Sequence, residues 1–289
     1  MTGAARGPGR GAPGVLRVVG TPLGNLADLS PRGREALESA DAIAAEDTRR
    51  TGRLLELLGL PKKPLLALFA PRERERAPAI VARLVAGENV ALVTDGGTPN
   101  VSDPGAVLIA AARAAGVRVE PIPGPSAVAV ALSVSSNSGD RFVFEGFLPA
   151  KSQARRTRLE ALARDERTIV LYEAPHRLAA ALADLVATFG PVRRCTIVRE
   201  ATKMHEEIVE GALAELATRF SGEVRGEVVL VLEGAAGSDD RVSLDASALA
   251  SWAVGLGLTP DRAAREVAEL TGTPRSRLLR RLRGGEPES

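Results

Sequence analysis

The sequence predicts an α/β fold: two α/β domains with a cleft between them, followed by a small C-terminal helical module. Short β-branched apolar runs alternate with amphipathic segments along most of the chain, which is typical of strands alternating with helices. The chain has 289 residues, enough for about two domains. Its 45% hydrophobic and 26% charged residues are ordinary for a globular protein and too apolar for a disordered one.

The first domain is expected to span residues 15–137. Ser30-Pro31 supplies an N-cap with proline at the first helical position, so a helix begins there. Gly59, Gly87 and Gly116 end later helices. Because strands and helices alternate in both halves of the chain, we expect largely parallel sheets covered on both faces. Strands are predicted at 16–20, 41–46, 89–94 and 117–122, and further helices at 48–58, 78–86, 106–115 and 126–134.

The second domain is expected to span residues 138–234, with the boundary in a Ser/Asn/Gly segment near 135–140. The strands at 194–200 and 205–210 are joined too tightly for a helical crossover, so they should form an antiparallel hairpin. The other strands are predicted at 141–147, 167–173 and 226–233, and the helices at 152–164, 176–188 and 212–220.

The two ends of the chain have different compositions. Residues 1–14 are rich in Gly, Pro, Ala and Arg and are predicted to be a disordered tail. Residues 235–245 are rich in Gly, Ser and Asp and are predicted to be a linker. Residues 246–285 should form a helix-turn-helix-like module with helices at 246–255, 260–271 and 274–283. The last helix has five arginines and no acid, which fits either a solvated face or a phosphate-contacting helix; we favour the second.

Composition excludes several classes of protein. The net charge is only +2 and aromatic residues are 3%, which argues against a strongly electropositive protein and against extensive base stacking. One cysteine and two histidines leave little for a disulfide or a metal cluster, and no metal site is predicted. The N-terminus lacks the apolar core of a signal peptide, and 121–139 is too interrupted to span a membrane. We therefore expect a cytoplasmic protein with no membrane partner.

Three predicted strands end in turns of small residues, at 20–25, 95–99 and 123–126. The carboxyl ends of strands in an open α/β sheet line a ligand crevice, and glycines there let the backbone approach a ligand closely. Each turn alone fits an ordinary strand-to-helix connection, but three together favour a site for a nucleotide-sized ligand. None has the spacing of a phosphate-binding fingerprint.

Charged residues gather at other predicted strand ends, in segments 46–50, 172–177 and 199–203. Such positions are functional more often than the same residues in mid-helix. Asp47 also fits a helix N-cap, and surface placement is the plainer interpretation of His176. A fourth segment, 151–158, has four cations and no acid, which fits a solvated helix start or a contact with a nucleic-acid backbone.

These motifs together resemble the 16S ribosomal RNA cytidine 2′-O-methyltransferases of the tetrapyrrole methylase superfamily. The glycine turns are shared by the superfamily, whereas EDTR, FLPAK, YEAPHR and REATK mark its RNA-modifying branch. The similar blocks cover about 16–234 in order: GTPLGNLAD (20–28), AAEDTRRTG (44–52), ALVTDGGTPNVSDPG (91–105), PIPGPSA (121–127), FEGFLPAK (144–151), LYEAPHR (171–177), REATKMHEE (199–207) and GEVVLVLEG (226–234).

The resemblance implies two α/β domains of the tetrapyrrole methylase type, S-adenosylmethionine (SAM) bound between them, a homodimer, and a cytidine in the decoding centre of 16S rRNA in the small ribosomal subunit as substrate. The sequence departs from the family at 68–74, which lacks the usual His and Asn, and at Asn100, where a small or apolar residue is more usual. The implied SAM contacts are Pro22, Asp95, Gly96, Gly97, Thr98, Val101, Ser126, Ala127 and Tyr172.

A ribose 2′-hydroxyl is a weak nucleophile, so its methylation should need a base or a polarising cation. Our candidates, in order, are Glu200 paired with Lys203, then Asp47, then His176. Phosphate contacts are expected from Arg49, Lys151, Arg155, Arg156 and Arg177. Two alternatives remain: a tetrapyrrole (precorrin or uroporphyrinogen) C-methyltransferase on the same fold, and a non-enzymatic nucleic-acid-binding protein.

Overall fold

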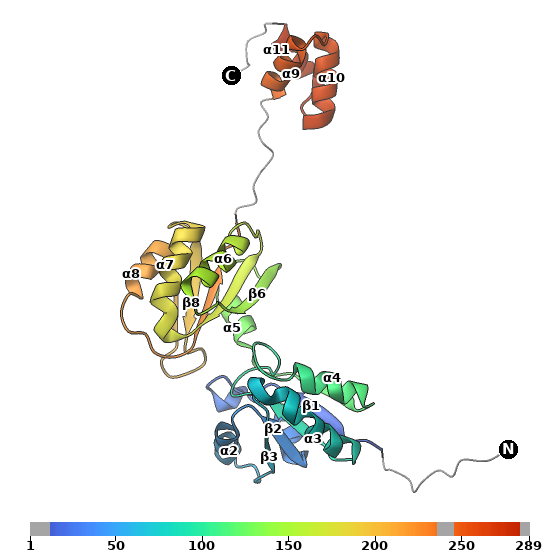
Figure 1. The fold of residues 1–289 in the computed structure, drawn as a ribbon. Coiled ribbons are helices and arrows are strands. Elements are labelled where there is room, and N and C mark those ends of the chain that lie inside the picture. The colour runs from blue at the N-terminus through green and yellow to red at the C-terminus, as the bar shows by residue number, and fades with distance from the viewer. Residues whose placement is uncertain (1–11, 236–245, 284–289) are drawn as a thin grey trace, which may run out of the picture. The chain divides into compact units, whose positions relative to one another are not determined.

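The computed structural model describes residues 12–235 and 246–283. The chain divides into two compact units, residues 1–234 and 235–289, and each is described by itself (Figure 1). Most of the predicted tail (1–11) and linker (236–245), and the last residues (284–289), lie outside the described residues.

The first half of the larger unit contains a five-stranded sheet in the order β3-β2-β4-β1-β5, and all its strand pairs are parallel, as predicted. Ser30 caps the first helix by accepting a hydrogen bond from the Gly33 amide. The strands are β1 (Val15–Val19), β2 (Ala42–Ala45), β3 (Leu65–Ala67), β4 (Val90–Val93) and β5 (Arg118–Ile122). The helices are α1 (Pro31–Ser39), α2 (Thr48–Leu57), α3 (Glu73–Val85) and α4 (Ala106–Ala114), with 3-10 turns at Leu26–Asp28 and Ala70–Arg72.

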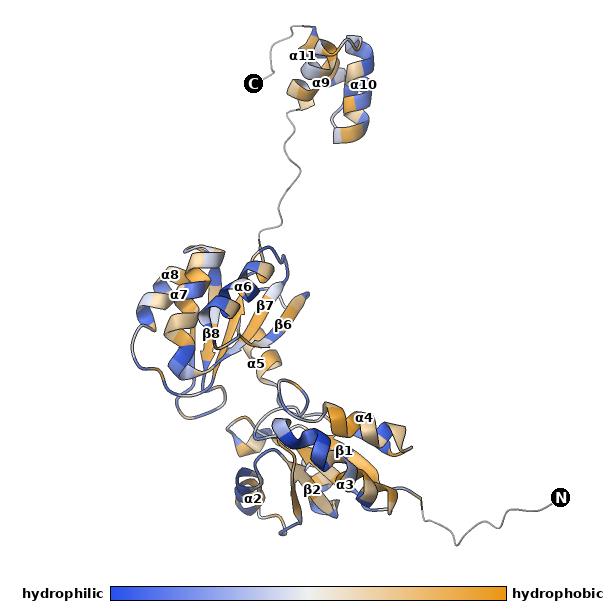
Figure 2. Ribbon diagram, viewed as in Figure 1, coloured by the Kyte–Doolittle hydropathy of each residue, from blue (hydrophilic) through white to orange (hydrophobic). Residues whose placement is uncertain are grey.

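Helices cover both faces of this sheet. Side chains alternate along each strand, so Ile43 packs with α1 and α2 on one face while Ala44 packs with α3 and α4 on the other. Figure 2 shows hydrophobic residues both in the strands of this sheet and in helix α4. This double cover explains why the strands read as continuous apolar runs.

Two features of this half differ from the prediction. The short strand β3, Leu65–Ala67, was not predicted, because three residues show no periodicity. Helix α3 begins at Glu73 rather than at Pro78, which lies inside the helix. Buried Glu73 holds the earlier start in place, since its Oε1 accepts hydrogen bonds from the amides of Gly105, Val107 and Leu108 at 3.0, 2.9 and 3.1 Å.

The second sheet has the order β6-β7-β10-β8-β9. Only β6 and β7 pair in parallel; β10 runs antiparallel to both its neighbours, and β8 and β9 form the predicted hairpin. A largely parallel second sheet was therefore wrong, because buried strands have the same apolar pattern in either direction. The strands are β6 (Phe142–Phe147), β7 (Thr168–Glu173), β8 (Arg194–Arg199), β9 (Glu207–Ala212) and β10 (Val228–Leu232).

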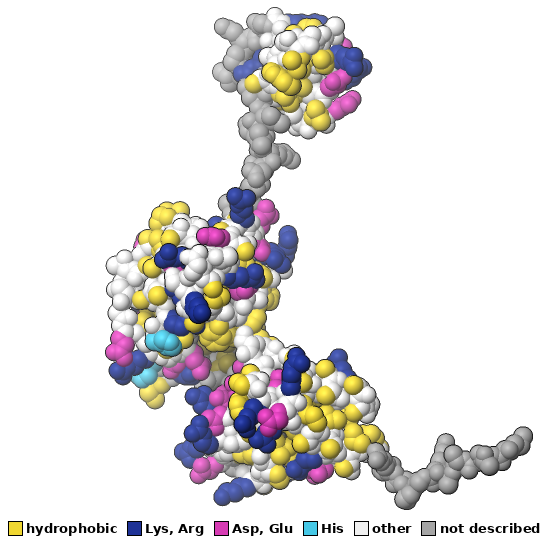
Figure 3. All heavy atoms as spheres, viewed as in Figure 1, with side chains coloured by type: hydrophobic (Ala, Val, Ile, Leu, Met, Phe, Trp, Pro, Cys, Tyr) yellow, Lys and Arg dark blue, Asp and Glu magenta, His cyan; other side chains and the backbone are white. Residues whose placement is uncertain are grey.

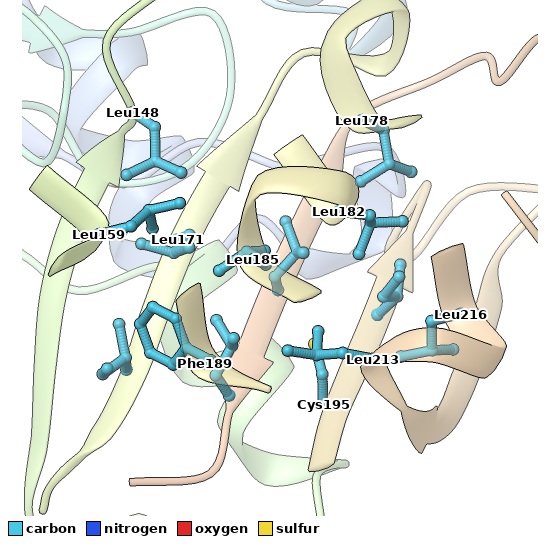
Figure 4. Packing of buried hydrophobic residues seen from close by; sticks show 14 of the residues in the cluster. Leu148, Leu159, Leu171, Leu178, Leu182, Leu185, Phe189, Cys195, Leu213 and Leu216 are labelled. Carbon is cyan, nitrogen blue, oxygen red and sulfur yellow. The ribbon is translucent and has the colours of Figure 1, made fainter. Parts of the chain in front are cut away.

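Three helices, α6 (Ser152–Leu162), α7 (Leu178–Phe189) and α8 (Leu213–Arg219), pack on one face of this sheet around the core in Figure 4. A 3-10 turn, Pro175–Arg177, precedes α7. The opposite face carries α5 (Ala127–Ser133), whose Val128 and Ala131 pack on β7, β8 and β10. Although we predicted α5 as the last helix of the first domain, its packing attaches it to the second sheet.

The smaller unit contains α9 (Ala246–Gly255), α10 (Pro260–Thr271) and α11 (Arg275–Leu282), close to the predicted ranges. Pro260 opens α10, and Gly272 ends it in the left-handed conformation at φ 69°. Its core is small: Ala250, Ala264, Val267 and Leu278. No helix among the described residues is long and apolar enough to cross a membrane.

Candidate active site

The three glycine turns interlock at the carboxyl end of the first sheet. The backbones of Gly20 and Gly124 are in direct contact, so a Cβ added to Gly20 would lie only 2.8 Å from the Gly124 Cα. Thr21 and Gly97 exchange both backbone hydrogen bonds at 2.9 Å, and the Thr98 hydroxyl donates to the Pro125 carbonyl at 3.0 Å. Side chains at Gly20 or Gly124 would push the turns apart, so the glycines are needed for the turns to converge.

Beside these turns lies a cavity of about 550 Å³, which is within the range of about 300–1,000 Å³ that is usual for small-molecule sites. Residues that follow strands of both sheets line it. The wall includes every predicted SAM contact except Pro22. Pro22 is buried next to Gly96: a Cβ added to Gly96 would lie 3.2 Å from the Pro22 carbonyl oxygen. The predicted contacts in the wall are Asp95, Gly96, Gly97, Thr98, Val101, Ser126, Ala127 and Tyr172.

The backbone is strained around this cavity. Among the described residues, the non-glycine residues with positive φ are Asn100, Ser102, Glu200 and Thr202, at 71°, 64°, 52° and 65°. They lie in just two segments, both of which contribute residues to the wall. Strain of this kind is retained mainly where function needs it. The left-handed conformation also accounts for Asn100, because asparagine tolerates it better than most residues.

Lys203 enters the cavity wall from the turn after β8. Its Nζ donates to Glu200 Oε1 at 2.8 Å and to Glu227 Oε2 at 3.2 Å. Two glycines make room for this group: a Cβ on Gly24 would overlap the Lys203 stem, and one on Gly226, at φ 91°, would overlap Glu200. A turn of the first half and two segments of the second thus fix one ammonium group.

The charge state of this group follows from its partners. Partial burial alone would lower the pKa of Lys203, but hydrogen bonding to Glu200 and the charge of Glu227 outweigh it and raise that pKa. The hydrogen bond from Lys203 lowers the pKa of Glu200. Glu200 Oε1 also accepts the Glu227 amide at 3.0 Å. Lys203 is therefore a fixed cation, and Glu200 a weak base.

A cluster of carboxyl groups lines another part of the wall: Glu46, Asp95 and Asp103. The Thr94 hydroxyl donates to Glu46 Oε2 at 2.7 Å. Burial raises the pKa of Asp103 to about 6; the Thr94 hydroxyl opposes this rise, and Glu46 and Asp95 add to it. Asp103 was not predicted as a site residue, although it lies within the ALVTDGGTPNVSDPG block.

Comparison with known families agrees with this site. A profile of the family described as Tetrapyrrole (Corrin/Porphyrin) Methylases matches residues 15–217. The chain belongs to the tetrapyrrole methylase family. The predicted family and the predicted SAM-dependent methyltransferase are thereby confirmed, and a non-enzymatic protein is excluded.

Several curated relatives match nearly the whole chain. A protein of Xylella fastidiosa (strain Temecula1 / ATCC 700964) named ribosomal RNA small subunit methyltransferase I is 48% identical over 92% of this chain and 98% of its own length. The protein of the same name from Escherichia coli O157:H7 is 42% identical, with 92% and 94% covered.

Solved structures share the fold of this methyltransferase at lower identity. The methyltransferase CobJ matches with a TM-score of 0.59 and 20% identity, over 77% of this chain and 95% of its own. The uroporphyrin-III C-methyltransferase of Thermus thermophilus, complexed with S-adenosyl homocysteine, matches with a TM-score of 0.55 and 21% identity, over 76% and 97%.

Of the predicted catalytic residues, Lys203 alone lines the cavity. Asp47 is the N-cap of α2, accepting the Arg49 amide at 2.8 Å, and hydrogen bonding from the Arg49 side chain holds the pKa of Asp47 well below its usual range. His176 is exposed (Figure 3 shows histidine at the surface). The structure therefore brings Lys203 and Glu200 together and leaves Asp47 and His176 apart from them.

The predicted RNA-binding residues differ in their surroundings. Arg155 is a correction: it is buried and its guanidinium pairs with buried Asp184 at 2.6 Å, so it is not available to a phosphate. Arg156 shares the same carboxylate at 2.7 Å from a half-exposed position. Arg177 donates to the Leu148 carbonyl at 2.6 Å and pairs with buried Glu173 at 3.1 Å.

The remaining two are more open. Arg49 is 89% exposed, although it pairs with Asp47 at 2.7 Å. Lys151 is exposed and has no ion-pair partner among the described residues. Arg158, in the same segment, pairs with Glu145. Three of the four cations of the basic segment 151–158 thus pair with two acids from elsewhere in the chain, which its sequence alone did not reveal.

Proposed function

We propose that this methyltransferase transfers the methyl group of SAM to the ribose 2′-oxygen of a cytidine in the decoding centre of 16S rRNA. The observation that carries the proposal is the identity of 42–48% with proteins named ribosomal RNA small subunit methyltransferase I, over 92% of the chain. The cavity supports it independently, because the residues assigned to SAM from the sequence, with the exception of Pro22, lie together in its wall.

The residues of the cavity suit a SAM-sized ligand. Gly96 and Gly97 present backbone without side chains, Ala127 and Val101 offer apolar surface, and Asp95 offers a carboxylate. Bound there, SAM would supply an electrophilic methyl group: the oxygen–carbon bond would form in line as the carbon–sulfur bond breaks, with S-adenosylhomocysteine as the leaving group. The task left to the protein is to position the ribose and to exclude water.

We assign the handling of the ribose hydroxyl proton to Asp103 rather than to Glu200. Asp103 lines the cavity and is the carboxyl whose pKa, about 6, is suited to accepting a proton near neutral pH. Glu200 already accepts hydrogen bonds from Lys203 and from the Glu227 amide. We assign Glu200 to positioning Lys203, whose ammonium group would stabilise negative charge developing on the ribose oxygen.

Contacts with the RNA backbone are assigned to Lys151, Arg49 and Arg156, whose charged groups are exposed. In the smaller unit, α11 carries Arg275, which pairs with Asp261 at 2.8 Å, among further arginines. A helix of this charge suits phosphate contacts more than base reading. We further propose a homodimer that acts on the small ribosomal subunit in the cytoplasm.

The second candidate function is C-methylation of a tetrapyrrole. Only the fold favours it, since the solved tetrapyrrole methyltransferases are about 20% identical to this chain. The test offers labelled SAM with either unmodified small ribosomal subunits or uroporphyrinogen as acceptor. We expect label in the RNA and none in the tetrapyrrole, and the reverse result would replace the proposed function with this one.

A further inference from the structure

Three of the few aromatic rings contact one another, and two of them, Phe147 and Tyr172, line the cavity. The chain has six Phe, one Tyr and one Trp. The ring of Tyr172 meets Phe144 at a centroid distance of 4.9 Å and an interplanar angle of 67°, and meets Phe147 at 5.5 Å and 65°. Both are edge-to-face contacts of the stabilising kind. The cavity wall of this aromatic-poor chain thus includes two aromatic rings in contact with each other.

A bulge in β6 produces this arrangement. Residues three apart in a regular strand point to opposite faces, so Phe144 and Phe147 would not both reach Tyr172. The pairing of β6 with β7 shifts between Phe144 and Gly146, and Gly146 has a φ of 71°. A β-bulge of this kind re-aims a side chain, often next to an active site. Here it turns Phe147 toward the cavity.

Phe147 is held in place but not covered. Phe147 packs edge-to-face against Tyr172, and burial raises the pKa of the Tyr172 phenol to about 12. The next residue, Leu148, is buried and its carbonyl accepts from Arg177. Yet Phe147 itself is 56% exposed and lines the cavity. An ordered, exposed aromatic face in a cavity wall is suited to stacking on a flat ligand.

We propose that Phe147 is the stacking surface for the cytosine base of the substrate nucleotide, which places the ribose in the cavity. The inference rests on the proposed function. A nucleotide held within a folded RNA must leave its neighbours before its ribose can enter an enclosed site, and it thereby loses stacking. An aromatic side chain in the enzyme restores that stacking, and Phe147 is a positioning residue in this sense.

The test compares Phe147→Leu, which keeps an apolar side chain but removes the ring, with Phe147→Tyr, which keeps the ring. When an aromatic ring that stacks on a base is removed, the affinity for the nucleic acid falls by about 5- to 150-fold. We expect kcat/KM for unmodified small subunits at saturating SAM to fall by about that factor in Phe147→Leu and to remain within threefold in Phe147→Tyr. The Kd for SAM, by calorimetry, should stay within twofold in both.

The matched control is Phe142→Leu, at the other end of β6, where the phenylalanine is 42% exposed and outside the cavity wall. It should leave kcat/KM unchanged. An unchanged kcat/KM in Phe147→Leu, an equal loss in Phe142→Leu, or a loss confined to SAM affinity would overturn the proposal. Failure of the wild-type protein to methylate ribose would overturn it together with the proposed function, whereas the other results leave that function standing.

Discussion

Replacing Gly24 by alanine tests whether the position of Lys203 matters for methyl transfer. Gly24 is exposed and its φ lies outside the left-handed region, so alanine can adopt its backbone. The new Cβ would overlap Lys203 Cγ and lie 3.1 Å from Cδ and 3.2 Å from Cε. Because the overlap involves the base of the side chain, the whole lysine stem has to move.

The size of the effect follows from these distances. Carbon atoms need about 3.5–4.0 Å, so Lys203 Cγ must shift by more than about 1 Å. Such a shift breaks the hydrogen bonds of Nζ to Glu200 and Glu227, now 2.8 and 3.2 Å long. A misplacement of about 1 Å can lower a rate about 100-fold. Because Gly24 is exposed, the free energy of unfolding should change by less than about 1 kcal/mol.

The assay measures kcat with small subunits at saturating SAM, alongside thermal unfolding. Gly52→Ala in α2 is the control, because its Cβ would meet only Leu65 Cδ1, at 3.6 Å. The double variant Gly24→Ala/Lys203→Ala should be no slower than Lys203→Ala alone, since both changes remove the same interaction. A kcat for Gly24→Ala within threefold of the wild type would refute the reasoning.

Three further predictions concern single side chains. The wild type is expected to show a rise of kcat/KM with pH through about pH 6, where Asp103 loses its proton and becomes a base, and Asp103→Asn should abolish this rise; a rise that persists in the variant contradicts the assignment. Arg155→Ala should lower the free energy of unfolding by about 3 kcal/mol, by leaving buried Asp184 without its buried partner, whereas Arg156→Ala should lower it by less than about 1 kcal/mol. Equal denaturant midpoints for the two would contradict this. Glu73→Ala should cost about 3 kcal/mol, because three amides lose their acceptor, and Glu73→Gln about 1 kcal/mol, because an amide oxygen remains; chemical denaturation measures both.

Local signals in the sequence predicted the first half well. Ser30-Pro31 and Asp47 act through neighbours in sequence, and both lie where the pattern placed them. Strand direction in the second sheet could not be predicted in the same way. It depends on the insertion of β10 between β7 and β8, and no local sequence pattern indicates which strands β10 will pair with.

The site residues also divide into those that local sequence predicts and those that depend on partners distant in sequence. The predicted SAM contacts lie together because backbone geometry fixes them, whereas charged side chains are governed by partners distant in sequence. Arg155 is an example: Asp184 neutralises it from 29 residues away. A signal for its burial was present, since Arg155 shares the buried face of α6 with Leu159 and Leu162. Asp103 was missed because its burial depends on how the 98–105 turn folds, which its sequence does not reveal.

The central claim is tested most directly by mass spectrometry of nucleosides from 16S rRNA after incubation of unmodified small subunits with labelled SAM. One measurement reports whether a methyl group was transferred, to which nucleoside, and whether to base or ribose. We predict labelled 2′-O-methylcytidine at a single position in the decoding centre. Label on a base, on another nucleoside, or absent from the RNA would contradict the account.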